Sequence, residues 1–357
     1  MKIIFFSNSS WNVYNFRLNL IKEVKKQNNE VYLLGNKDKF SEALTREGIK
    51  FISFNLSQKG KNVFNELLTI FRLFLILFKL RPDFIFSFTI KPNLYSLITA
   101  FFLNSKIIVN ITGLGNTFIN KGLINFLIIQ SYKILLKKSF HIFFQNNDDL
   151  DLFKKKKLLK TKNFDVLPGS GINTKNFNNS HKKNINIGSV KFIFCGRTIK
   201  EKGIFEFCEA SKIIKNENEN IKFFILGFNK YDHLKSKYNH IHFLDSNTFK
   251  DKSLDDFDCL ILPSYREGLP RSVLEFSLRG IPSIVSDVPG CRSIIINKFN
   301  GLLCEARSTE SLVKSIKYFL ELPLNLRLKM SYNAKKFVIN NFDESIVIKK
   351  YLKLLNE

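Results

Sequence analysis

The sequence predicts an α/β protein with two doubly wound parallel sheets. Short apolar runs that indicate buried strands alternate with longer helical patterns, and the alternation starts again after a polar stretch rich in Lys and Asn at 181–189. Strands that alternate with helices are typical of parallel sheets covered by helices on both faces. The length of 357 residues exceeds what one hydrophobic core usually supports, so we expect two domains.

The first half contains five apolar runs of strand length. They predict strands at 3–6, 31–34, 84–87, 106–110 and 141–145. Amphipathic or apolar patterns between them predict helices at 16–26, 40–47, 63–80 and 123–138. The run at the N-terminus is too short for a signal peptide and lacks a cleavage site of small residues, so we expect it to be the first strand.

The second half repeats this organisation. Its apolar runs predict strands at 191–195, 222–226, 259–262 and 283–286. We therefore expect a first Rossmann-like domain at 1–168, a second at 190–335, and a C-terminal helix at 336–357 that packs back on the first domain.

The chain is strongly basic, with a net charge of +25. Residues 1–180 hold 27 Lys and Arg against 11 Asp and Glu, and residues 181–357 hold 29 against 20. One explanation is a negatively charged partner, and the other is an AT-biased coding sequence, because Lys, Asn, Ile and Phe are all abundant. The larger excess of positive charge in the first half favours contact with an anionic membrane surface.

Five cysteines, an odd number without a Cys-x-x-Cys pair, lie in apolar or helical patterns: Cys195, Cys208, Cys259, Cys291 and Cys304. This usage is typical of a protein in a reducing compartment. We therefore expect a cytoplasmic protein.

The segment 63–80 is the one that comes nearest to a transmembrane pattern. Arg72 interrupts it, and Glu66 and Lys79 lie near its ends, which argues against a transmembrane helix. It is either a helix buried against the sheet or a helix that dips into a membrane interface. With the equally apolar segment 123–138, it favours peripheral contact with the inner face of the plasma membrane.

Two carboxylates lie eight positions apart in the segment 262–275. Glu267 stands on a turn rich in Gly and Pro after the strand 259–262, and Glu275 lies about two helical turns further on. Ligands of open α/β sheets bind at the carboxyl ends of the strands. Two acceptor groups at this edge fit a polyhydroxylated ligand such as a sugar or a ribose.

A glycine turn follows the strand 191–195 and precedes a helix at 204–214. Backbone donors and the helix dipole favour an anion there, and Arg197 and Lys202 add two cations. A surface Arg and Lys would be the simpler explanation for this loop alone. Combined with Glu267 and Glu275, the loop predicts a site for a nucleotide sugar, with cations on the diphosphate and carboxylates on hydroxyls.

These motifs resemble those of retaining glycosyltransferases of family 4. Enzymes of that family have the GT-B fold, in which two Rossmann-like doubly wound domains face a cleft. The resemblance rests on Gly-Arg at 196–197, Glu-Lys-Gly at 201–203 and the two glutamates. It implies that Arg197 and Lys202 hold the diphosphate, that Glu275 binds ribose and that Glu267 contacts the donor sugar. Residues Gly196, Gly268 and Leu269 would complete the donor site.

The first half resembles a narrower subgroup of these enzymes. Segments 88–93 and 110–118 are similar to those of bacterial transferases, N-acetylgalactosaminyltransferases among them, that extend undecaprenyl-diphosphate-linked sugars. The resemblance implies an acceptor site made by Asn15, Arg17, Lys91, Asn93, Thr112, Gly113 and Gly115. A simple surface position is the alternative for Lys91.

Some features depart from this family or carry a simpler explanation. The loop 9–17 lacks the paired glycines of many relatives, and His141 lies in a strand pattern, which favours a structural role. Asp149 and Asp151 have the spacing of the metal-binding Asp-x-Asp motif, but they fit the start of a helix better. His240 and His242 lack a third metal ligand nearby.

The sequence therefore predicts transfer of a hexosyl or N-acetylhexosaminyl group, with retention, from a nucleotide sugar such as a UDP-sugar to a polyprenyl-diphosphate-linked saccharide. Such a step belongs to the synthesis of capsule, O-antigen or another bacterial surface glycan. The cations make a metal cofactor unnecessary. Alternatives are a nucleotide-sugar 2-epimerase of related fold and a basic nucleic-acid-binding protein, although the aromatic residues do not interleave with an exposed basic stripe.

Overall fold

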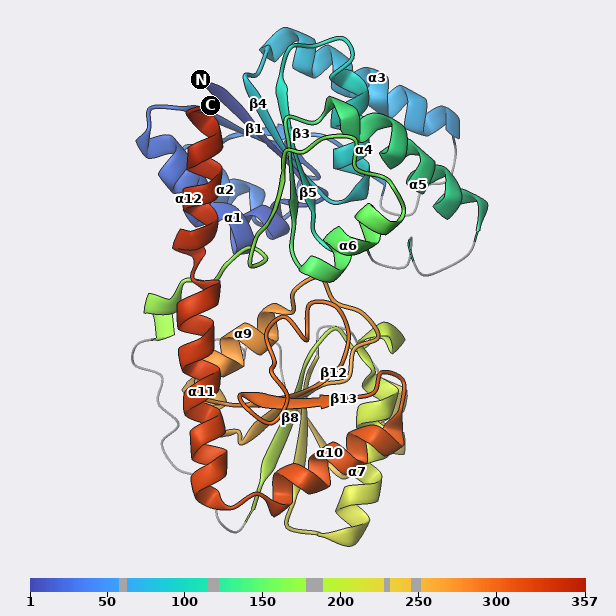
Figure 1. Cartoon of the computed structure of the whole chain (residues 1–357), viewed down its shortest axis with the longest axis vertical. Helices are drawn as coiled ribbons and strands as arrows, with labels where there is room; N and C mark the ends of the chain where they lie inside the picture. Colours follow the sequence, from blue (N-terminus) through green and yellow to red (C-terminus); the bar gives the residue numbers. More distant parts are fainter. Residues whose placement is uncertain (58–62, 115–117, 119–121, 178–188, 228–231, 245–251) are drawn as a thin grey trace. The chain divides into compact units, whose positions relative to one another are not determined.

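A computed structural model describes residues 1–57, 63–114, 118, 122–177, 189–227, 232–244 and 252–357. The chain forms two compact units, the first made of 1–171 and 346–357 and the second of 172–345. Each unit is a parallel sheet with helices on its faces, which confirms the predicted fold class (Figure 1).

Unit 1 contains a sheet of seven parallel strands in the order β3-β2-β1-β4-β5-β6-β7. The strands are β1 (Lys2–Phe6), β2 (Glu30–Gly35), β3 (Lys50–Ser53), β4 (Phe84–Phe88), β5 (Lys106–Ile111), β6 (His141–Phe144) and β7 (Phe164–Val166). The strand order reverses between β1 and β4. This reversal creates the position at which open α/β sheets usually bind ligands.

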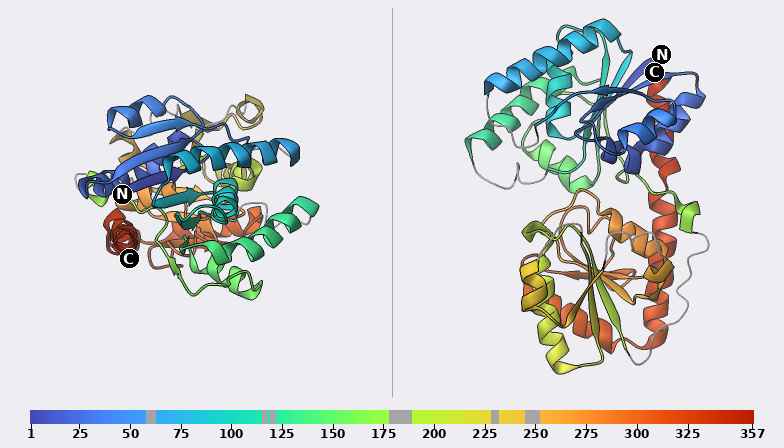
Figure 2. Two further views of the ribbon diagram at one scale, coloured as in Figure 1. Left: turned by 90° about the horizontal axis from the view of Figure 1, so that it is seen from above. Right: turned by 180° about the vertical axis from the view of Figure 1, so that it is seen from behind.

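Helices cover both faces of this sheet. They are α1 (Ser10–Lys26), α2 (Ser41–Arg46), α3 (Val63–Leu80), α4 (Ile90–Thr99), α5 (Leu123–Leu135), α6 (Asn147–Lys155) and α12 (Glu344–Leu355). Buried side chains of α1 and α12 share one core cluster, whereas those of α3, α4, α5 and α6 share the other. The second cluster explains why α3 and α5 lie on the same side of the sheet (Figure 2).

Helix α1 begins earlier than the sequence predicted. Ser9 accepts a hydrogen bond from the backbone N–H of Asn12, so the helix starts at Ser10 rather than at Phe16. A serine N-cap satisfies one of the unpaired amides of a first helical turn. The segment predicted as a loop at 9–17 is therefore almost entirely helical.

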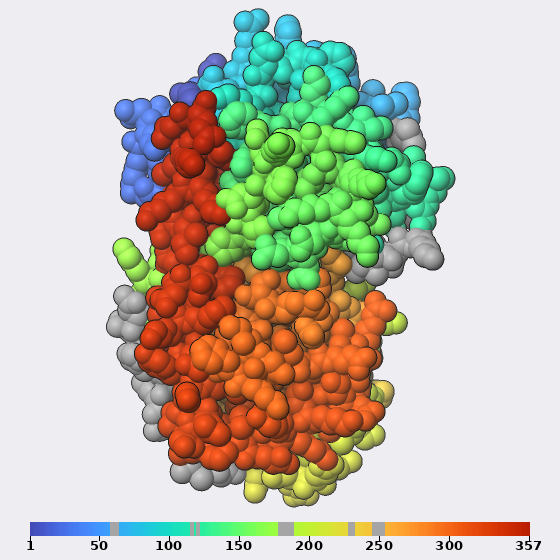
Figure 3. All heavy atoms as spheres, in the orientation of Figure 1, coloured from blue at the N-terminus to red at the C-terminus, as the bar shows by residue number. Residues whose placement is uncertain are grey.

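The C-terminal segment consists of two helices rather than one. Helix α11 (Leu324–Phe342) packs in the core of unit 2, while α12 returns to unit 1. Between them, Asp343 accepts hydrogen bonds from the backbone N–H of Ser345 and from the hydroxyl of Thr174. Within unit 1, Lys350 of α12 forms an ion pair with Asp165 at 2.6 Å. The C-terminal end of the chain, red in Figure 3, lies against the green part of the chain.

Unit 2 contains six parallel strands in the order β10-β9-β8-β11-β12-β13. They are β8 (Lys191–Gly196), β9 (Lys222–Gly227), β10 (Ile241–Leu244), β11 (Cys259–Leu262), β12 (Ser283–Ser286) and β13 (Gly301–Cys304). The helices are α7 (Ile204–Glu217), α8 (Asp232–Lys237), α9 (Arg271–Leu278), α10 (Thr309–Glu321) and α11. Here the order reverses between β8 and β11.

Candidate functional site

The loop after β8 carries the first part of the candidate site in unit 2. Arg197 is exposed, and Lys202 ends a short turn just before α7. Gly203 joins that turn to α7 with a φ of 74°, and a Cβ on it would lie 2.0 Å from the carbonyl oxygen of Pro263. Only glycine therefore allows the β8 and β11 loops to approach so closely.

The loop after β11 is tied to the first loop by polar contacts. The backbone N–H of Tyr265 donates to the carbonyl of Glu201 at 2.9 Å. Lys202 forms an ion pair with Glu267, whose Oε1 also accepts a hydrogen bond from the Ser264 hydroxyl at 2.8 Å. Both charged side chains are largely withdrawn from solvent, with 20% and 10% exposure. The contacts hold the Glu267 carboxylate beside the start of α7.

Glu275 lies on α9, one turn after Arg271. Its Oε1 accepts from Nε of Arg271 at 2.8 Å, and the Glu275 side chain is 14% exposed. Burial raises the pKa of Glu275, and the Arg271 guanidinium opposes this rise. Burial raises the pKa of the Cys195 thiol at the end of β8, and the Glu275 carboxylate adds to this rise, so the carboxylate lies near the same edge of the sheet.

A third loop, after β12, meets the Glu267 segment. Gly290 has a φ of 81°, and a Cβ on it would lie 2.4 Å from the carbonyl oxygen of Gly268. Sequence reasoning missed Gly290, Ser264 and Arg271. The Pro-Gly pair at 289–290, after the predicted strand 283–286, is the sequence signal that could have marked this loop.

These loops converge where the strand order of unit 2 reverses. Gly196 ends β8 and Arg197 and Lys202 follow it, while Glu267, Gly268, Leu269 and Glu275 follow β11, the neighbouring strand. The ion pair between Lys202 and Glu267 joins the two segments. Cations at a helix start attract anions, while carboxylates accept hydrogen bonds from hydroxyls. This combination is chemically suited to a ligand with a phosphate part and a polyhydroxylated part.

The residues predicted for an acceptor lie in unit 1. Arg17 is buried on α1, with its guanidinium 4.8 Å from the centre of the Phe88 ring at the end of β4. Lys91, in the first turn of α4, pairs with Glu66 at 2.6 Å. The Lys91 side chain is 24% exposed, so it is half-buried beside Glu66. Both cations lie near the reversal between β1 and β4.

The remaining acceptor candidates are less accessible or outside the described residues. Asn15 donates from its side chain to the carbonyl of Trp11. Asn93 is 1% exposed and donates to the carbonyl of Asn110 at 2.9 Å. Thr112 and Gly113 are half-buried, and they line a small hollow together with Asn93. Gly115 lies outside the described residues.

The candidate metal ligands have structural positions. Asp149 is buried in the first turn of α6, where its Oδ2 accepts from the side chain of Asn146, the N-cap residue. His240 bonds to the Ser211 hydroxyl, and His242 stacks on Phe224. His141 begins β6, and burial lowers its pKa. Among the described residues, no cluster of three His, Cys, Asp or Glu could hold a metal ion.

Comparison with known proteins gives the family. Residues 175–337 match the family of glycosyl transferases group 1, and residues 2–146 match a glycosyl transferase 4-like family. An N,N'-diacetylbacillosaminyl-diphospho-undecaprenol alpha-1,3-N-acetylgalactosaminyltransferase of Campylobacter jejuni is 30% identical over 99% of this chain and 98% of its own. A capsular polysaccharide biosynthesis glycosyltransferase, CapM of Staphylococcus aureus, is 22% identical over 92% of this chain and 90% of its own.

Solved structures agree on the fold. A glycosyltransferase from Rickettsia africae superposes with a TM-score of 0.79 at 18% identity, covering 99% of this chain and 97% of that one. Anabaena HepE, in complex with UDP and glucose, gives 0.78 at 13% identity over both whole chains. Together with the relative from Campylobacter jejuni, these matches identify the chain as a glycosyltransferase of the GT-B fold that belongs to group 1, the retaining family 4 type.

Proposed function

We propose that this protein transfers a hexosyl or N-acetylhexosaminyl group from a UDP-sugar to a hydroxyl of a polyprenyl-diphosphate-linked saccharide, with retention, during synthesis of a bacterial surface glycan. The observation that carries the proposal is the convergence of Lys202, Glu267 and Glu275 at one edge of unit 2. The relative from Campylobacter jejuni supports the choice of acceptor, because its name describes transfer to an undecaprenol-diphosphate-linked sugar. Anabaena HepE, whose structure holds UDP and glucose, supports the choice of donor.

The donor would bind along the loops that leave β8 and β11. Arg197, Lys202 and the amides at the start of α7 would neutralise the diphosphate, with Gly196 leaving room for it. Glu275 would accept hydrogen bonds from the ribose. Glu267, with Gly268 and Leu269, would contact the transferred sugar.

Charge on the leaving group explains why the cations matter. As the glycosidic bond breaks, negative charge develops on the diphosphate, and preorganised cations and backbone donors stabilise that charge most strongly in the transition state. Arg197 and Lys202 are therefore proposed as catalytic residues as well as binding residues, together with Glu267. An electrostatic mechanism of this kind needs no metal ion.

The acceptor would bind to unit 1. Arg17 and Lys91 supply the positive charge that a lipid diphosphate requires. Asn15, Asn93, Thr112 and Gly113 surround the same strand ends and would contribute polar contacts, with Gly115 following in the chain.

An apolar face on unit 1 supports a membrane partner. Helices α3 and α5 expose large apolar side chains at helical spacing, although their opposite sides are buried in the core. The exposed side chains are Phe64, Leu67, Leu68, Phe71, Leu75 and Phe78 of α3 and Leu123, Ile124, Phe126, Leu127 and Ile134 of α5. We call this set the α3–α5 face. Exposed apolar side chains gathered on a helix surface commonly mark interaction sites.

Basic residues border the α3–α5 face. Lys133, Lys137 and Lys138 are exposed at the end of α5, and Arg72 and Lys79 are exposed on α3. Apolar side chains with flanking cations fit a bilayer surface that carries anionic lipids. No described helix is long and apolar enough to cross a membrane. We therefore propose peripheral binding at the cytoplasmic face of the plasma membrane, where a lipid-linked acceptor lies.

A screen of nucleotide sugars against lipid-linked acceptors tests this function. Product mass would identify the transferred group, and the anomeric configuration of the product would test retention. A product formed from the nucleotide sugar without any acceptor would favour the 2-epimerase alternative. Failure to transfer sugar from any nucleotide sugar would overturn the proposal.

A further inference from the structure

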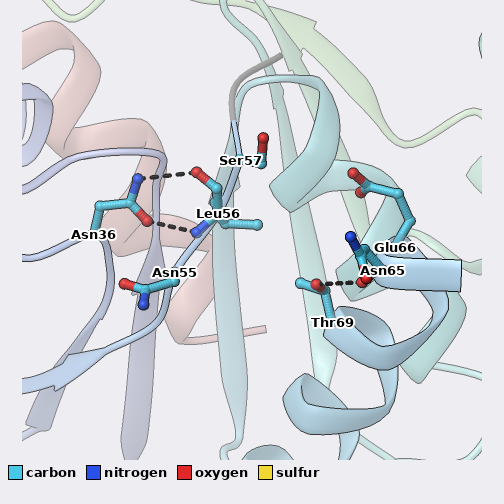
Figure 4. A pocket seen from close by; sticks show the side chains of 7 residues that line it. All are labelled: Asn36, Asn55, Leu56, Ser57, Asn65, Glu66 and Thr69. Atoms are coloured by element: carbon cyan, nitrogen blue, oxygen red, sulfur yellow. Dashed lines mark hydrogen bonds between the residues drawn. The ribbon is translucent and has the colours of Figure 1, made fainter. Parts of the chain in front are cut away.

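Unit 1 contains a cavity of about 370 Å³, lined mainly by polar residues, that none of the proposed roles uses. It lies between the chain that leaves β2 and β3 on one side and the first turns of α3 on the other (Figure 4). Its volume falls within the roughly 300–1,000 Å³ of small-ligand pockets.

One wall of the cavity is fixed by a pair of hydrogen bonds. The Asn36 side chain, after β2, donates to the carbonyl of Leu56 at 2.9 Å and accepts from the backbone N–H of Leu56 at 2.5 Å. This clamp holds the extended segment after β3, so that Asn55 and Ser57 flank the buried Leu56 (Figure 4). The amide and the hydroxyl are both exposed at the cavity.

The other wall is the start of α3. Asn65, Glu66 and Thr69 line it, and the Thr69 hydroxyl donates to the carbonyl of Asn65 at 2.7 Å. The ion pair between Lys91 and Oε1 of Glu66 fixes the Glu66 carboxylate from the side of α4. The cavity is therefore bounded by two anchored walls.

The chemistry of the lining selects a class of ligand. Among the described residues, the cavity is lined by amides, hydroxyls, one carboxylate and one apolar side chain, and by no cation. Amide and carboxylate oxygens accept hydrogen bonds from sugar hydroxyls, and amides donate to sugar oxygens. This lining suits an uncharged sugar residue.

We propose that this cavity is a binding subsite for a neutral sugar residue of the acceptor, recognised by Asn55, Ser57 and Glu66. The inference rests on the proposed function, because that function supplies a saccharide acceptor to unit 1. Lys91 links the cavity to the predicted acceptor site, since its ammonium group touches the same Glu66 carboxylate that lines the cavity. The sugar that carries the reactive hydroxyl need not be the one bound here.

Binding of simple sugars to the full chain tests the subsite directly. The probes are the methyl glycosides of N-acetylglucosamine, N-acetylgalactosamine and diacetylbacillosamine, measured by saturation-transfer NMR and titration. We expect at least one probe to bind, and Asn55→Ala/Ser57→Ala and Glu66→Gln each to weaken it by about fivefold or more, the loss of one or two hydrogen bonds. Asn104→Ala, at an exposed asparagine before β5, should bind like the wild type.

Kinetic measurements distinguish an error in the proposed subsite from an error in the proposed function. In the same variants, KM for the lipid-linked acceptor should rise, while affinity for UDP should not change. If no probe binds, or if the double variant binds and reacts like Asn104→Ala, the subsite is overturned while glycosyl transfer stands. If the wild type binds a probe but transfers no sugar, the subsite stands and the proposed function fails. Circular dichroism and thermal unfolding check that every variant is folded.

Discussion

Lys202 and Glu267 form an ion pair that joins the loops after β8 and β11. The two residues lie 65 positions apart in sequence, and the pair exists because β8 and β11 are neighbours in the sheet of unit 2. Ser264 donates to the same carboxylate oxygen, so the position of Glu267 is determined by two side chains. This geometry supports a role for the pair in presenting a cation to a diphosphate and a carboxylate to a sugar.

Replacing Lys202 should weaken donor binding. A hydrogen bond to a charged group contributes roughly 1.5–3 kcal/mol, so Lys202→Ala should lower the affinity for a UDP-sugar roughly 10- to 100-fold. Lys200, exposed on the same turn, provides a matched control. Calorimetry that gives equal affinities for Lys202→Ala and Lys200→Ala would remove Lys202 from the donor site.

Glu275→Gln should have two separate effects. If the carboxylate binds ribose, the affinity for the nucleotide sugar should fall by about one to two orders of magnitude. Calorimetry checks this loss, and an unchanged affinity would exclude the ribose role.

The second effect concerns stability and pH. Because burial raises the pKa of Glu275, the native state holds this proton at pH values at which the unfolded chain has lost it. The contribution of Glu275 to the free energy of unfolding must therefore fall as the pH rises from its ordinary pKa through the raised one. Glu275→Gln should abolish this decline in denaturant titrations, whereas Glu219→Gln, at an exposed residue, should leave it intact.

The five cysteine thiols should be unreactive in the native protein. All five are buried, and burial raises the pKa of Cys208 and of Cys304 to about 12. Thiolates are the reactive species, so alkylation at pH 8 should be slow before unfolding and fast after it. A cysteine that is alkylated at the unfolded rate in the folded protein would contradict the described burial.

The α3–α5 face should control binding to lipid vesicles. Phe71 and Leu75 are 57% and 49% exposed, and their replacement by Glu should reduce binding by roughly tenfold or more, because each apolar side chain buried contributes about 1.5–3 kcal/mol. Leu326→Glu/Leu328→Glu, at similarly exposed residues of α11, is the matched control. Sedimentation with vesicles that contain anionic lipid provides the measurement.

Two further measurements extend this test: the salt dependence of vesicle binding and the oligomeric state of the protein. Because Lys133, Lys137 and Lys138 attract anionic lipid, added salt should weaken binding. Equal sedimentation of the α3 and α11 variants would argue against a membrane at this face. Self-association that depends on Phe71 and Leu75, without vesicle binding, would assign the face to a second copy of the chain instead.

The sequence predicted the inner strands of both sheets well and the edge strands poorly. Strands such as β11 and β12 are buried on both faces, so they form continuous apolar runs. By contrast, β3, β7 and β13 were not predicted, and each lies at the edge of its sheet. Edge strands carry partly exposed residues, as in β3 and β7, and so lack that signal.

The candidate donor residues could be predicted because they follow strands in short motifs. The contacts that orient them could not be predicted, since they join residues that are distant in sequence: Lys202 meets Glu267, and Gly290 meets Gly268. The cavity beside Glu66 could not be predicted from the sequence either. It forms between the segment after β3, which Asn36 holds by hydrogen bonds to Leu56, and the start of α3. Close approaches of this kind depend on tertiary structure rather than on local patterns.

Two glycines of unit 2 allow a controlled test of the packing around Glu267. Gly290 and Gly280 have similar φ values, 81° and 74°, so replacement by Ala strains both backbones by roughly 1–2 kcal/mol. Only Gly290 also faces a neighbour, because its Cβ would lie 2.4 Å from the Gly268 carbonyl, whereas Gly280 has nothing within 4 Å. Gly290→Ala should therefore lower the melting temperature more than Gly280→Ala does. It should also weaken binding of the UDP-sugar, because relief of the clash moves the segment that carries Glu267. If calorimetry finds the two variants alike in melting temperature and donor affinity, the loop after β12 does not support the donor site.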